Sequence, residues 1–225
     1  MDTSVNAGAI LYALADSRLP IGGHVHSGGV EEAVASGLVR DLATVEAYLR
    51  RRITTSGLVA ASLAAAVCAG ELTESRADAE ADARILAPAA RAASRAQGRG
   101  LLRLAKQIWP QQDRPQQDRP QQDWTRLSPR PHLSTAFGAV GAVAGIAPAD
   151  LAGIVVYTTL TGAATAAQRL LALDPADVAA CTVRLAQLCD RTAAEAATGP
   201  AALSDPLQDV LAQRHPLRDM PLFAS

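Results

Sequence analysis

The sequence predicts an all-α fold, a single compact multi-helix domain of about nine or ten helices. Hydrophobic residues make up 49% of the 225 residues but aromatic residues only 3%, so the core must be built from Ala, Leu and Val. Alanine and leucine are strong helix formers, and the aromatic, β-branched stretches typical of strands are nearly absent. Capping residues, glycines and prolines separate apolar segments of helical length. We therefore expect one domain over residues 1–225.

The N-terminal half divides into four predicted helices at its glycines and capping residues. The predicted segments are 6–15, about 28–36, a helix that starts at Asp41, and 56–69. Ser27 is the expected cap of the second helix, and Gly37 and Gly70 are expected to end the second and fourth. In the third helix Arg50, Arg51 and Arg52 are expected on the solvated side. The fourth lacks a polar face, which is typical of a central helix.

The C-terminal half continues the helical pattern. The predicted segments are an acidic surface helix at 73–86, then 88–109, a helix from about 132, 174–198 and about 204–214. Gly98 and Gly100 lie inside the second of these. Because glycine costs a helix interior about 0.5–1 kcal/mol, we expect close packing there. Asp174 and Pro175 form a capping residue followed by proline at the first helical position, a clear start signal.

Two uncharged stretches, 133–149 and 151–168, raise the question of membrane spans. Gly141 and Gly145 have the G-x-x-x-G spacing that pairs helices in membranes. However, both stretches are rich in Ala, Thr and Gly, and Asp150 separates them, whereas a spanning helix needs about 20 strongly apolar residues. We predict buried helices of a soluble bundle and no membrane partner.

Two segments are predicted to lie outside the helical framework. The sequence Pro-Gln-Gln-Asp-Arg starts at Pro110, is repeated at Pro115 and recurs in part at Pro120. A proline in every copy prevents a helix, so 110–124 is predicted to be a flexible surface insert, with a peptide-docking tract as the alternative. Residues 216–225 are predicted to be a mobile tail whose Leu222 and Phe223 dock into a partner.

Charge and cysteine content limit the expected class of partner and the expected compartment. A net charge of −1 gives no support for a nucleic-acid partner. Three cysteines, without a C-x-x-C pair, fit a reduced cytosol, and the N-terminus shows no signal peptide. We therefore expect a cytoplasmic protein.

The residues suited to chemistry are few. A nucleotide-binding P-loop needs Gly-Lys followed by Ser or Thr, but the only lysine, Lys106, precedes Gln107. Ser27 lacks the G-x-S-x-G context of a hydrolase nucleophile. His24 and His26 are weak metal candidates, because a stable nickel or zinc site needs about four ligands; packing or hydrogen bonding is the alternative. We expect no cofactor and no catalytic site, which favours a binding or scaffold protein over an enzyme.

The glycine-rich segment 16–32 resembles the N-terminal signature of the urease accessory protein family UreF. The matching residues are Asp16, Ser17, Pro20, Gly22, Ser27, Gly29 and Glu31, while His24 stands where the family usually has Phe and His26 where it often has Tyr. Further similarity lies in 91–104, 132–138, 167–171, 214–215 and 222–223. The chain departs from the family pattern at 172–175, at Pro216 and at Ala224.

This resemblance implies an all-helical, homodimeric, non-catalytic scaffold for nickel insertion into apo-urease. It implies two further partners, a UreD/UreH-type protein and the GTPase UreG, whose GTP hydrolysis would be coupled to assembly of the metal centre. The alternatives are a nickel metallochaperone that uses His24 and His26, and an unrelated helical enzyme. The partner-binding candidates are Pro20, Gly22, Gly23, His24, His26, Ser27, Gly29, Glu31, Arg95, Gly98, His215, Leu222 and Phe223.

Overall fold

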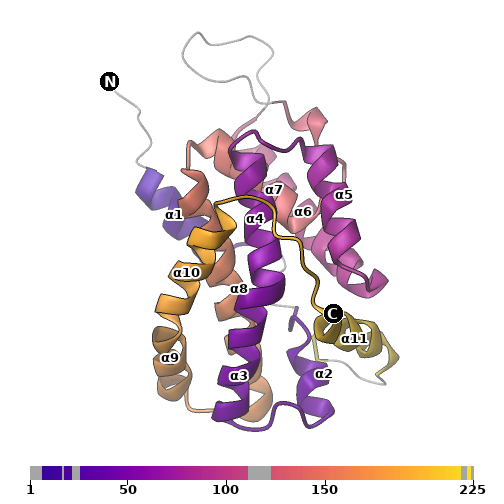
Figure 1. Cartoon of the computed structure of the whole chain (residues 1–225), viewed down its shortest axis with the longest axis vertical. Coiled ribbons are helices and arrows are strands. Elements are labelled where there is room, and N and C mark those ends of the chain that lie inside the picture. The colour runs from indigo at the N-terminus through magenta and orange to yellow at the C-terminus, as the bar shows by residue number, and fades with distance from the viewer. Residues whose placement is uncertain (1–6, 17, 22–25, 111–122, 219–221, 224–225) are drawn as a thin grey trace.

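The computed structural model describes residues 7–16, 18–21, 26–110, 123–218 and 222–223, and the regular elements within these ranges are helices (Figure 1). The α-helices are α1 (Ala7–Ala15), α2 (Val30–Ala35), α3 (Leu42–Arg52), α4 (Leu58–Cys68), α5 (Glu74–Arg84), α6 (Pro88–Ile108), α7 (Leu133–Ala144), α8 (Pro148–Leu171), α9 (Pro175–Arg184), α10 (Ala186–Ala196) and α11 (Pro206–Arg214). The predicted all-α class is confirmed.

The centre of the molecule is α4, which packs against α5, α7, α8 and α10. All of its residues except Ala60 and Cys68 are buried, as its lack of a polar face predicts. Small residues let the neighbouring helices approach closely. A Cβ on Gly138 of α7 would lie 2.5 Å from the Val67 Cβ and 2.7 Å from the Ala64 carbonyl oxygen, so only glycine fits this crossing.

Local signals place most helix ends correctly. Asp41 caps α3 by accepting a hydrogen bond from the Thr44 N–H at 2.8 Å, and Thr73 caps α5. Gly37 and Gly70 have φ angles of 76° and 74°, as expected for residues that end a helix in the left-handed region.

The predicted helix start at Ser56 is wrong, because α3 continues into α4 through a π-helical turn, Ile53–Gly57. The Thr54 and Thr55 hydroxyls donate to the Arg50 and Arg51 carbonyls at 3.1 and 2.7 Å, within the turn where the α-helical ladder widens. Arg51 and Arg52, expected on the solvated side, are half-buried.

Two further helix boundaries differ from the prediction. The cap of α2 is Gly29, with φ 83°, and the Ser27 hydroxyl accepts only a long 3.4 Å bond from the Glu31 N–H. The predicted helix 174–198 is divided into α9 and α10 at Leu185, whose side chain is fully buried.

None of the helices in the described ranges combines the length and apolar character needed to cross a bilayer. The stretches 133–149 and 151–168 instead contribute much of the buried core through α7 and α8. The predicted burial of both is confirmed.

The predicted insert 110–124 falls largely outside the described residues, but its C-terminal anchor is defined. Trp124 is buried, and its indole N–H donates to the Trp109 carbonyl at 2.9 Å. Of the predicted tail 216–225, the structure describes Phe223 with its ring buried in the core of the same chain; docking of the tail into a partner stays a prediction.

Candidate functional site

The two ends of the chain meet at the carboxylate of Glu31, in the first turn of α2. This carboxylate is buried and accepts three hydrogen bonds. His215 donates from Nε2 at 2.7 Å, and the backbone N–H groups of Leu222 and Phe223 donate at 2.7 and 3.0 Å. Four of the predicted partner-binding residues therefore form one cluster, although Glu31 lies 184 positions from His215.

The Glu31 carboxylate remains charged in this buried position. Burial raises its pKa, but the Leu222 N–H, His215 and the Phe223 N–H together outweigh that effect, so the pKa is lowered overall. Hydrogen bonds to a charged acceptor contribute about 1.5–3 kcal/mol each. The cluster thus fixes the end of the chain to α2 through one anion.

The glycine-rich segment is held in shape by side chains from α3 and α11. Gly28 and Gly29 have φ angles of 59° and 83°, which a Cβ would strain. The Gly28 carbonyl accepts from the Tyr48 hydroxyl at 2.9 Å and from the Arg52 guanidinium. Arg52 also donates to Gln208 Oε1, which lies 3.1 Å from the Tyr48 hydroxyl oxygen. Burial raises the pKa of Tyr48, which keeps the phenol neutral as a donor.

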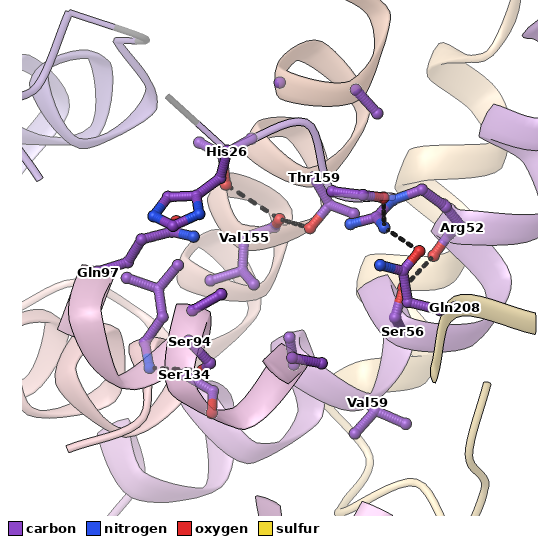
Figure 2. A pocket seen from close by; sticks show the side chains of 18 of the residues that line it. His26, Arg52, Ser56, Val59, Ser94, Gln97, Ser134, Val155, Thr159 and Gln208 are labelled. Carbon is purple, nitrogen blue, oxygen red and sulfur yellow. Dashed lines mark hydrogen bonds between the residues drawn. The ribbon is translucent and has the colours of Figure 1, made fainter. Parts of the chain in front are cut away.

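A cavity of about 350 Å³ lies beside this segment, between α4, α6, α7, α8 and α11. Figure 2 shows Arg52 and Gln208 at one end and His26 and Gln97 at the other, with Val155 on the wall between them. The remaining lining is largely apolar. Leu63 and Phe137 contribute to it from α4 and α7, and residues near the two chain ends complete it, namely Leu14, Leu19, Ile21 and Phe223. Such a lining suits binding of apolar groups.

Arg95 and Gly98 lie in a second cluster, which fixes the start of α7. Arg95 donates to Asp82 at 2.7 Å and to the Arg130 carbonyl at 2.8 Å. A Cβ on Gly98 would overlap the Pro131 carbonyl oxygen and lie 2.8 Å from the His132 carbonyl carbon. Both candidates therefore have a positioning role inside this chain.

His132, the residue at the centre of this second cluster, is fully buried. Its ring lies 3.0 Å from Asp82 through Nε2 and 3.0 Å from the Ser94 hydroxyl through Nδ1. Burial lowers the pKa of His132, and the opposing effect of Asp82 does not restore it. The ring is neutral at pH 7, with Nε2–H donating to the carboxylate.

The other predicted site residues lie in varied surroundings. Ser27 and Gly29 are buried, Pro20 is exposed, His26 is half-buried, and the Leu222 side chain is 78% exposed. Gly22, Gly23 and His24 lie outside the described residues. Direct contact of all these residues with a partner stays a prediction.

The metal prediction concerned His24 and His26. In the described part of the chain, no three His, Cys, Asp or Glu side chains are grouped so that they could hold a metal ion. His24 is outside that part, so a contact of this pair with nickel also stays a prediction.

Sequence reasoning missed several residues that organise these clusters: Tyr48, Arg52, Asp78, Asp82 and Gln208. Only the three consecutive arginines at 50–52 offered a signal, since an arginine on an otherwise apolar helix face marks an internal contact. The partners of Arg51 and Arg52, Asp205 and Gln208, lie more than 150 positions away and left no local trace.

Comparison with known proteins identifies the family of this chain. The family model UreF matches residues 39–186. A urease accessory protein UreF of Mycobacterium sp. (strain JLS) is 67% identical over 215 residues, which cover 96% of this chain and 97% of the relative. UreF proteins of Mycolicibacterium vanbaalenii and Mycobacterium marinum are 64% and 60% identical, each covering 96% of this chain and 98% of the relative. The chain therefore belongs to the UreF family of urease accessory proteins and is an accessory protein rather than an enzyme.

Proposed function

We propose that this protein is a cytoplasmic, homodimeric scaffold for nickel insertion into apo-urease. It acts together with a UreD/UreH-type protein and the GTPase UreG, and couples GTP hydrolysis on UreG to assembly of the metal centre. The observation that carries this proposal is the family membership, which the relatives extend over nearly the whole chain.

The geometry supports a binding role in one respect. The family-signature segment and the C-terminal tail are joined at Glu31, and this junction leaves Leu217 and Leu222 82% and 78% exposed. Large apolar side chains at the surface are typical of protein–protein contacts when they are grouped. We infer that the joined chain ends form the surface that the UreD/UreH-type protein contacts.

The experiment is a reconstitution with purified components. The protein should co-purify with the UreD/UreH-type protein and UreG, and the mixture should activate apo-urease with nickel and GTP. Omission of this chain should abolish activation, and the chain alone should hydrolyse no GTP. Full activation without it would contradict the proposal.

Nickel binding by the isolated chain separates the scaffold from the metallochaperone alternative. Equilibrium dialysis should show no tight nickel binding. Submicromolar binding that disappears when His24 and His26 are both replaced by Ala would favour the alternative.

A further inference from the structure

Helix α6 carries a one-sided distribution of charge. Its 21 residues include Arg91, Arg95, Arg99, Arg103 and Lys106 and no acidic residue. The chain as a whole is nearly neutral, with 21 basic and 22 acidic residues. Positive charge is therefore concentrated on this helix while acidic residues lie elsewhere.

The N-terminal half of the helix is neutralised within the molecule. Arg95 forms ion pairs with Asp82 at 2.7 Å and Asp78 at 3.4 Å, and Arg91 lies 3.9 Å from Asp82. Both aspartates belong to α5. Carboxylates of the same chain therefore neutralise the N-terminal half of α6.

The C-terminal half of the helix has no such counterpart. Arg99, Arg103 and Lys106 follow one another at spacings of four and three residues, which places them on one face. All three are exposed, and in the described ranges their side chains form no hydrogen bond or ion pair. Like charges at such spacing cost a helix about 0.2–0.5 kcal/mol per pair.

A neighbouring segment extends the same positive surface. The contacts from Trp124 to the Trp109 carbonyl, at 2.9 Å, and from Arg95 to the Arg130 carbonyl, at 2.8 Å, align residues 124–130 antiparallel to α6. This segment adds Arg126 and Arg130, both exposed. Neither side chain forms a hydrogen bond or ion pair in the described residues, although the charge of Arg126 acts on the nearby Asp123 carboxylate. We define the α6 basic surface as Arg99, Arg103, Lys106, Arg126 and Arg130.

Nearly all of the other described arginines have an interaction partner within the chain. Those that pair with a carboxylate are Arg18, Arg40, Arg50, Arg51, Arg76, Arg84, Arg91, Arg95, Arg184, Arg214 and Arg218. Arg52 bonds to Gly28 and Gln208, and Arg169 lies over the Phe223 ring. Unpaired arginines therefore gather on the α6 basic surface, with Arg191 as an isolated exception.

We propose that the α6 basic surface docks an acidic surface of another protein in the urease maturation assembly. This rests on the proposed function but concerns residues outside the Glu31 cluster and the cavity. A protein fits better than a nucleic acid. Trp124 beside the surface is buried, so it offers no ring for base stacking, and the net charge of −1 disfavours a polyanion.

The test measures binding of the double variant R99E/R103E to the UreD/UreH-type protein, to UreG and to apo-urease, each purified. Affinity for one of them should fall at least about tenfold at about 50 mM salt. The difference should shrink at about 500 mM salt, because exposed charges are screened. Circular dichroism should be unchanged, since neither side chain has a partner to lose among the described residues.

The matched control is R191E, which reverses another exposed, unpaired arginine, on α10. R103E alone should weaken binding and R191E should not. R99Q/R103Q replaces the double variant if the reversed charges prevent folding.

The outcomes separate the two proposals. If the wild-type chain joins none of the three proteins, the proposed function fails and the docking inference fails with it. If it joins them and R99E/R103E binds equally well, or R191E is equally harmful, the docking inference alone is overturned. Loss of binding only to RNA or to anionic vesicles, with protein assembly intact, overturns it as well.

Discussion

Replacing Gly98 by alanine tests whether α6 packs as closely as the structure shows. A Cβ at this position would overlap the Pro131 carbonyl oxygen and lie 2.8 and 2.9 Å from the His132 carbonyl carbon and oxygen. These atoms belong to the backbone and cannot swing aside as a side chain can. The segment must therefore move away from α6, which strains the hydrogen bond from the His132 N–H to Asp78 at 2.9 Å.

The expected cost can be estimated from its parts. Overpacking costs about 1–3 kcal/mol and a weakened buried hydrogen bond about 1 kcal/mol more, while alanine regains up to about 1 kcal/mol of helix propensity. The net loss is about 1–3 kcal/mol. For a chain of this size each kcal/mol shifts Tm by about 2–4 °C, so G98A should lower Tm by about 2–12 °C.

The assay is thermal unfolding followed by circular dichroism, with G153A as the matched control. Gly153 is also inside a helix, but its added Cβ meets nothing within 4 Å. G153A should therefore raise stability by about 0.5–1 kcal/mol, the usual propensity gain. A Tm for G98A equal to or above that of the wild type would refute the close packing.

Three further predictions follow from the clusters and the insert. E31Q keeps the side-chain shape but removes the anion, so the amides of Leu222 and Phe223 should exchange hydrogen faster and stability should fall by about 2 kcal/mol; unchanged exchange would contradict the anchoring role. Burial lowers the pKa of His132 in the folded chain. Just below pH 6.5, the ordinary histidine pKa, only the unfolded chain therefore takes up a proton on this imidazole. The free energy of unfolding should thus fall as pH drops through that range, by at most about 1.4 kcal/mol per pH unit in urea titrations, and an increase would have the wrong sign. Deleting residues 111–120 should leave Tm within a few degrees of the wild type, because loop length costs only about 0.6 kcal/mol per doubling, whereas a large drop would show that the insert is part of the fold.

The helix framework was open to prediction because its signals are local. Asp41 meets Thr44 three residues away, and Asp174 caps through the Ala176 N–H two residues away. Such contacts depend on neighbours in the chain, so composition, caps and glycines are enough to locate them. The lack of a polar face on α4 likewise predicted a central helix.

The sequence also indicated that Gly98 must be close to something, since a glycine inside a helix needs a reason, but not what it contacts. The π-helical turn at 53–57 shows the same limit. Its threonines hydrogen-bond locally, yet the Thr55 hydroxyl also lies 2.6 Å from the Asp205 carboxylate, 150 positions away. Local propensity alone predicted a new helix there, whereas the structure continues α3 into α4 and brings this turn against a distant residue.

The candidate site depended most on the tertiary structure. The family signature and the tail were each recognisable as segments, but nothing in either shows that Glu31 holds His215, Leu222 and Phe223. A buried carboxylate must find donors wherever the packed helices bring them, and here they come from the other end of the chain. The sequence alone determined most of the helices, because the caps, glycines and prolines that start and end them act on residues a few positions away. Only the tertiary structure decided which buried charged groups meet. Their partners lie far apart in the sequence and become neighbours only when the helices pack, and no local pattern indicates which ones do.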